Sequence, residues 1–146
     1  MTFTLAAGCA SPPTGASAPM PDNFALTLWR RTTDLRHTYF KLSPDGDLAF
    51  AGGRAAIARQ ADRVGALSDA QRRELWRIIA ESDLLTARDH PFAKPQRVQY
   101  QIEIKGDGWS RSLNLVDDDT GAAGAERLHV ALFKMHAERA YTPPGF

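Results

Sequence analysis

The sequence predicts an α+β domain in which an antiparallel sheet of about five strands carries two helices on one face. Apolar and polar residues alternate over residues 98–105, which is typical of a strand with one buried and one solvated face. Ser68 and Gln71 have the spacing of a capping box, which predicts the start of a helix. The expected elements follow the order strands, helix, strands, helix. Because the strands keep a polar face, we expect both helices to share the apolar one.

The first three strands are expected between residue 24 and the glycine pair at 52–53. Apolar residues alternate with others over 24–29 and again over 38–42. Pro44 and Gly46 favour a hairpin turn after the second strand, since Pro restricts φ and Gly accepts a positive φ. The third strand then places its apolar residues on the same face as those of the second.

The next elements are a segment without clear periodicity and the first helix. Residues 54–66 fit either a short edge strand or an irregular excursion. The helix that Ser68 opens is expected to end near Ser82, with Leu84 and Leu85 buried beneath the domain.

A second hairpin and a second helix complete the domain. Residues 90–95 are expected to form a loop because two prolines interrupt it. The strand at 98–105 turns through a glycine-rich segment into a partner strand that begins near Trp109. The three acidic residues 117–119 precede a helix over about 123–140, where they suit the positive end of the helix dipole.

Composition excludes several classes of protein. The chain has 146 residues, a length that favours one domain. A single cysteine forms no internal disulfide, and 18 Lys and Arg against 17 Asp and Glu argue against a strongly basic nucleic-acid binder. No apolar run is long enough to span a bilayer. We therefore expect no nucleic-acid partner and a membrane contact only through an added lipid.

The first residues carry a motif that suggests such a lipid. Ala6-Ala7-Gly8-Cys9 resembles the lipobox of small bacterial envelope lipoproteins, in which the cysteine after small residues receives a diacylglyceryl group. The resemblance implies that residues 1–8 are the remnant of a signal peptide and that Cys9 is the lipidation site. Residues 9–23, rich in Pro, Ser and Ala, then read as a flexible linker to a domain at 24–146. It also implies a location in the bacterial cell envelope, on the periplasmic side or at the cell surface.

Two interpretations of this segment stay open. Only eight residues precede Cys9, with no Lys or Arg among them, whereas a signal peptide has a basic start and a longer apolar run. Either the true signal lies upstream of Met1, or Cys9 is an incidental cysteine in a tail.

The order of elements is also similar to that of emfourin-type inhibitors of metalloproteases. In both, strands precede a capped helix, then come a hairpin and a final helix. This similarity covers about residues 24–140, and it transfers no functional residue to this chain.

Motifs for catalysis, cofactors and metals are weak. The chain has neither a G-x-x-x-x-G-K-[S/T] nor a G-x-S-x-G sequence, so we expect no catalytic residue and no cofactor. Glu126 and His129 have E-x-x-H spacing on a helix, but we interpret His129 and His136 as solvated or rim histidines rather than metal ligands. His37 and His90 lack an orienting partner in the sequence, and residues 117–119 are read as a helix entry rather than a calcium site.

Candidate contact residues for a partner are two tryptophans and two arginines, because interfaces favour these types. They are Trp29, Arg30, Arg31 and Trp109, although packing in the core or at a sheet edge is the commoner role for both tryptophans. A wider arginine set either forms one basic surface or is a solvated face with local acids such as Asp62, Asp69 and Glu74, and we favour the second. That set comprises Arg30, Arg31, Arg36, Arg54, Arg59, Arg63, Arg72, Arg73 and Arg77.

These observations favour a non-enzymatic envelope module that is anchored through Cys9 and binds another macromolecule, such as a protein. One alternative is a secreted protein that resembles a protease inhibitor. The other is an enzyme whose type the motifs do not reveal.

Overall fold

The fold comes from a computed structural model that describes residues 15, 18–90 and 97–140. The chain forms the α+β domain that the sequence predicts, built on a six-stranded sheet in the order β4-β3-β2-β1-β5-β6. Every neighbouring pair is antiparallel. In chain order the elements are β1 (Ala25–Arg31), β2 (His37–Leu42), β3 (Asp47–Gly52), α1 (Arg54–Ile57), β4 (Asp62–Ala66), α2 (Asp69–Glu81), the 3-10 helix η1 (Asp83–Leu85), β5 (Gln99–Gly106), β6 (Trp109–Val116) and α3 (Ala122–Ala140).

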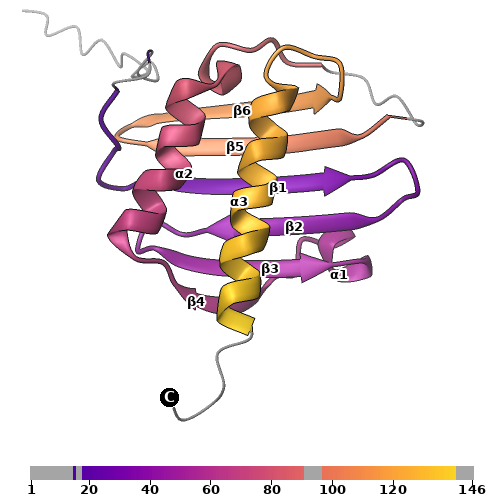
Figure 1. The fold of residues 1–146 in the computed structure, drawn as a ribbon, viewed down its shortest axis with the longest axis horizontal. Coiled ribbons are helices and arrows are strands. Elements are labelled where there is room, and N and C mark those ends of the chain that lie inside the picture. The colour runs from indigo at the N-terminus through magenta and orange to yellow at the C-terminus, as the bar shows by residue number, and fades with distance from the viewer. Residues whose placement is uncertain (1–14, 16–17, 91–96, 141–146) are drawn as a thin grey trace, which may run out of the picture.

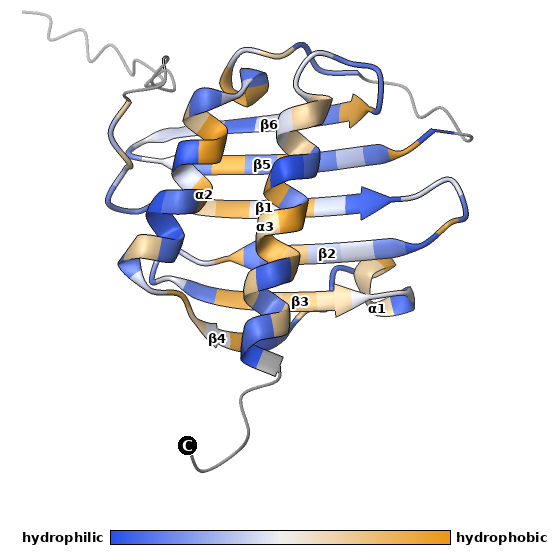
Figure 2. Cartoon of the chain, viewed as in Figure 1, coloured by the Kyte–Doolittle hydropathy of each residue, from blue (hydrophilic) through white to orange (hydrophobic). Residues whose placement is uncertain are grey.

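The two long helices cover one face of the sheet, as expected. Figure 1 shows α2 and α3 side by side across the strands, with α1 at the end of β3. Figure 2 shows apolar stretches of β1 and β5 beneath them. The core between the layers includes Phe24, Leu26, Leu28, Phe40, Leu42, Leu48, Leu75, Ile79, Leu84, Ile104, Leu115, Leu128 and Leu132, none more than 2% exposed.

The strand count is six rather than about five. Residues 54–66, which the sequence left between an edge strand and an irregular excursion, form the single-turn helix α1 and the edge strand β4. The pairing of β4 with β3 shifts register between Leu48 and Ala49, and Gly65 has a φ of 150°. A bulge of this kind interrupts the two-residue period, so β4 carries no clear alternation.

Local signals located the first helix closely. The Ser68 hydroxyl accepts a hydrogen bond from the backbone N–H of Gln71, and the Gln71 side chain accepts one from Ser68 N–H, at 3.1 and 2.9 Å. The helix ends at Glu81 with Ser82 as its cap, and Leu84 and Leu85 are buried in η1.

The folded domain begins by Ala18, earlier than the predicted boundary at Phe24. The carbonyl of Ala18 accepts a hydrogen bond of 2.7 Å from Trp76 Nε1, Met20 packs against the core, and Pro21 is buried. The end of the predicted linker is therefore part of the domain. The predicted signal remnant and Cys9 lie outside the described residues, as does most of the loop at 90–95. In the described ranges no helix combines the length and apolarity needed to cross a membrane.

Candidate functional site

The face of the sheet opposite α2 and α3 is called the open face. Its strand residues alternate with those of the core, so side chains directly opposite each other in the register share it. At one end, α1 lies against it, with Ala56 buried beside Tyr39 and Ala51. The open face includes Thr27, Trp29 and Arg31 of β1, His37, Tyr39 and Lys41 of β2, Asp47, Ala49 and Ala51 of β3, Gln99, Gln101, Glu103 and Lys105 of β5, and Ser112 and Asn114 of β6.

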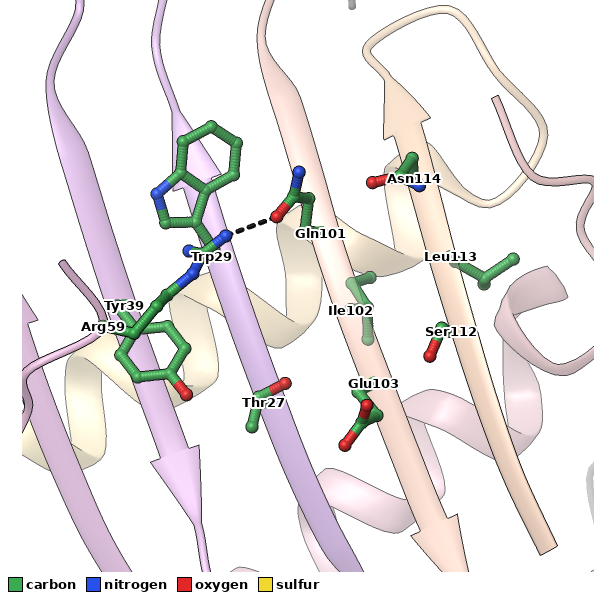
Figure 3. A pocket seen from close by; sticks show the side chains of 10 residues that line it. All are labelled: Thr27, Trp29, Tyr39, Arg59, Gln101, Ile102, Glu103, Ser112, Leu113 and Asn114. Carbon is green, nitrogen blue, oxygen red and sulfur yellow. Dashed lines mark hydrogen bonds between the residues drawn. The ribbon is translucent and has the colours of Figure 1, made fainter. Parts of the chain in front are cut away.

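Two aromatic rings and a guanidinium meet near the middle of the open face. Trp29 and Tyr39 are directly opposite each other in the β1–β2 pair. The Arg59 guanidinium lies 4.8 Å from the centre of the Trp29 ring and 5.3 Å from that of Tyr39 (Figure 3). Arg59 also donates a hydrogen bond to the side-chain oxygen of Gln101. Each cation–π contact stabilises an exposed arrangement by about 0.5–1 kcal/mol.

The backbone that carries Arg59 is of a kind that favours glycine. The N–H groups of Arg59 and Gln60 bond to the carbonyls of Ala56 and Ala55, which closes α1 with a Schellman motif. Arg59 occupies the left-handed position of that motif, with a φ of 57°. This conformation costs a residue with a Cβ about 1–2 kcal/mol relative to the right-handed one. The turn directs the Arg59 side chain back over the aromatic pair.

Beside this pair lies a corner with polar atoms that lack partners. Arg31 and His37 are directly opposite each other at the ends of β1 and β2, and the His37 ring centre is 5.4 Å from that of Trp29. Trp29 Nε1, His37 Nδ1, and Nε and one terminal nitrogen of Arg31 are buried atoms without a hydrogen-bond partner. Burial lowers the pKa of His37, and the positive charges of Arg31 and Arg59 lower it further. The corner is thus electropositive and rich in donors.

The acidic residues of the open face are already paired. Glu103 lies 3.0 Å from Lys105, and Asp47 lies 3.0 Å from Arg63. Within the described ranges, no ion pair involves Arg31, Arg59 or Lys41. Three cations on this face therefore have no carboxylate of the chain to neutralise them.

Two adjoining hollows lie along the open face. One, of about 260 Å³, has Trp29, Arg59, Gln101, Ser112 and Asn114 among its lining residues (Figure 3). The other, of about 450 Å³, includes Lys41 and Lys105 in its lining. Thr27, Tyr39 and Glu103 line both. The two hollows thus adjoin each other along β1, β2 and β5.

Of the four predicted contact residues, two lie on the open face and two do not. Trp29 and Arg31 are on it. Trp109 is only 7% exposed, and its ring centre lies 6.2 Å from that of Trp76, so the structure places it in the core, which is the alternative role for this tryptophan. Arg30 points to the helix side of the sheet, where its guanidinium donates two hydrogen bonds to Glu126. It therefore links β1 to α3 within the domain.

The E-x-x-H pair of α3 is structural and partly buried. Glu126 accepts hydrogen bonds from Arg30 and from the Tyr100 hydroxyl. His129 is 8% exposed, and its Nε2 lies 2.9 Å from the Thr38 hydroxyl. The interpretation of His129 as a solvated or rim residue is therefore wrong, because this turn of α3 faces the sheet. Burial is the main reason that the pKa of His129 falls to about 4.

The remaining candidates also have local partners. His136 stacks on Phe50 with ring centres 4.1 Å apart. His90 lies 3.1 Å from Asp119, a partner that the sequence did not identify. Asp119 also accepts a hydrogen bond from Val116 N–H just before α3, which agrees with a helix entry. Across the part of the chain that the structure describes, no group of three or more His, Cys, Asp or Glu has an arrangement suited to a metal ion.

The sequence analysis did not identify Tyr39 or Gln101 as site residues. It grouped Arg59 with arginines that were expected to have acidic partners nearby. That expectation is right for Arg72 and Arg77, which pair with Asp69 and Glu74 on α2. It fails for Arg59, whose partners come from three different strands. No local pattern signals such a set.

The fold and the open face define the chain as an α+β domain with one helix-covered and one polar, partly aromatic sheet face. No family model matches the chain, and no curated protein does either. The resemblances to envelope lipoproteins and to emfourin-type inhibitors therefore stay predictions.

Proposed function

We propose that this protein is a non-enzymatic binding module for another macromolecule and that the open face is its contact surface. The observation that carries the proposal is the Arg59 guanidinium over the Trp29 and Tyr39 rings, on a face that neither long helix covers. Trp, Tyr and Arg dominate the energetics of protein interfaces, because they combine large apolar area with directed polar groups.

The unpartnered donors beside this contact support the same proposal. A buried polar atom without a hydrogen bond costs about 1–3 kcal/mol. Trp29 Nε1, His37 Nδ1 and two nitrogens of Arg31 are such atoms, and they lie on one corner of one face. A ligand that brings acceptors to this corner would recover that free energy on binding.

Site-specific photo-crosslinking in the native host tests the proposal. A photoreactive residue is placed at Lys41 or Ser112, both exposed on the open face, and at Arg73 or Lys134, both exposed on the long helices. We expect a discrete adduct from the open-face positions and none from the helix positions. The adduct should also disappear with Arg59→Ala. Adducts that form equally from both faces, or from neither, would contradict the proposal.

We further propose that the module is a lipoprotein of the bacterial cell envelope, anchored through Cys9. Support comes from the lipobox-like residues before Cys9 and the linker composition that follows. Mass spectrometry of the protein from the membrane fraction should show a diacylglyceryl mass on Cys9, and Cys9→Ser should move the protein to the soluble fraction. A free Cys9 thiol that reacts with an alkylating reagent in the isolated protein would contradict the anchor.

A further inference from the structure

We infer that the partner presents an acidic polypeptide segment to the open face, with its carboxylates at Arg31, Arg59 and Lys41. This inference rests on the proposed function, because it names the chemistry of the partner for the same surface.

The first argument for an acidic partner is charge complementarity. The two acids on the open face, Glu103 and Asp47, each have a basic neighbour at 3.0 Å. Arg31, Arg59 and Lys41 have no carboxylate partner in the described part of the chain, although the whole sequence is nearly neutral, at +1. These three cations are therefore available on this face, where they favour a negatively charged partner.

The second argument is the set of hydrogen-bond donors at the corner. Trp29 Nε1 and the two Arg31 nitrogens can only donate, and none of them has an acceptor. A carboxylate accepts at two oxygens, and hydrogen bonds from a guanidinium to a carboxylate are among the strongest in proteins. Trp29 and Arg31 lie two positions apart on the same face of β1, so the donors of both residues belong to this corner.

The shape and polarity of the hollows favour a peptide. The two hollows, of about 260 and 450 Å³, adjoin at three shared lining residues, and Arg59 lines the first and Lys41 the second. Hydroxyl and amide side chains on β1, β5 and β6 line the smaller hollow, where they can bond the N–H and C=O groups of an extended backbone: Thr27, Gln101, Ser112 and Asn114. A nucleic-acid backbone, by contrast, is bound through many regularly spaced phosphate contacts. Three separated cations fit scattered carboxylates better.

The test is binding of a short polyglutamate peptide, capped at both ends, to the purified protein by isothermal titration calorimetry at low salt. A polyglutamine peptide of the same length and oligothymidylate are the comparison ligands. We expect polyglutamate to bind, polyglutamine not to bind, and oligothymidylate to bind more weakly than polyglutamate. Arg59→Gln and Arg31→Gln should each weaken polyglutamate binding about tenfold, since each removes a charge-assisted hydrogen bond.

Arg73→Gln is the matched control, because it removes the same charge from an exposed position on α2. It should leave the affinity for polyglutamate unchanged. Lys41→Gln, at an exposed strand position, provides a third open-face variant should either arginine variant fold poorly by circular dichroism. Equal weakening by Arg73→Gln and the open-face variants would overturn the inference, as would tighter binding of oligothymidylate.

The two proposals fail in different ways. Adducts from the open face in cells, together with no binding of polyglutamate, would overturn the acidic segment and leave the contact surface standing. Polyglutamate binding that the open-face variants do not weaken would show that the acidic ligand binds elsewhere. Absence of both adducts and binding would overturn both proposals.

Discussion

Arg30 in strand β1 donates two hydrogen bonds to Glu126 of α3. One runs from Nε to Oε2 at 2.9 Å, and the other from Nη2 to Oε1 at 3.1 Å. The Tyr100 hydroxyl of β5 donates to the same carboxylate. Two strands and α3 thus meet at one partly buried carboxylate, and Arg30 and Glu126 are 96 positions apart in the sequence.

We predict that Glu126→Gln lowers the free energy of unfolding by about 1–3 kcal/mol, because it leaves Arg30 and Tyr100 with a weaker, neutral acceptor. Urea unfolding measures the change. In a double-mutant cycle with Arg30→Met, the sum of the two single-variant losses in free energy of unfolding should exceed the loss in the double variant. The reason is that each substitution breaks the same interaction. Strict additivity would show that the pair contributes nothing.

The left-handed backbone at Arg59 gives a second prediction. Arg59→Gly should be more stable than Arg59→Ala by about 1 kcal/mol, because both lose the side chain but only Ala keeps the strained Cβ. The same pair at exposed Arg73 in α2 should show the opposite order by about 1 kcal/mol, since Ala favours a helix interior. Thermal and urea unfolding compare the four variants. Alanine more stable than glycine at both positions would contradict the strained turn.

A third prediction concerns pH and His129. Its pKa is lowered to about 4, first by burial and then by Arg30, while Glu126 opposes the change. The other groups that face it are the Thr38 hydroxyl and the rings of Phe40 and Phe133. In the unfolded chain, a histidine has a pKa of about 6.5, so between these two values the unfolded state binds more protons. The stabilising effect of a neutral His129 is therefore full above about pH 6.5 and is lost as the pH falls toward 4.

The size of this pH effect is about 3 kcal/mol, obtained from the difference between the two pKa values. Urea unfolding at a series of pH values measures it. His129→Gln should flatten the dependence between pH 4 and 6.5. A residual slope is expected in that variant, because the pKa values of His37 and His136 are also lowered. An unchanged slope would show that the pKa of His129 is the same in the folded and unfolded states, which contradicts the prediction.

Close packing at Gly124 gives a fourth prediction. A Cβ added there would lie 2.5 Å from the Cβ of Ser82, so α3 approaches the end of α2 only because this residue is glycine. Gly124→Ala should lower stability by about 1–2 kcal/mol, even though Ala favours a helix by about 1 kcal/mol. Ala123→Gly, at the exposed neighbouring position, should lower stability by about 1 kcal/mol through propensity alone. A higher melting temperature for Gly124→Ala would contradict the close approach.

Sequence patterns predicted most of the elements because their signals are local. The alternation over 98–105 agrees with β5, and the capping box agrees with the first turn of α2 to the residue. They did not resolve β4, since Val64 is an extra residue opposite the step from Leu48 to Ala49 and breaks the alternation within β4. They also did not decide between a contact role and a core role for Trp109, because a position near a hairpin turn says nothing about the helix α2 that packs against it.

The site residues depended on distant parts of the chain. Trp29 was identified from its type and its outward position in β1, and the structure places it on the open face. Its contact with Arg59 joins residues from β1 and from the turn after α1. The sequence grouped Arg59 with eight other arginines, and only the path of the chain across Tyr39 distinguishes it from them.

The sequence by itself determined the α+β class, the capped helix and the two-sided character of the strands, because hydrophobic periodicity and capping act over a few residues. Tertiary structure decided which polar residues meet. The strand order put β1 between β2 and β5, which brought Trp29 opposite both Tyr39 and Gln101 and buried His129 over Thr38. These pairings follow from sheet register and from helix docking, and both depend on contacts between segments far apart in the chain.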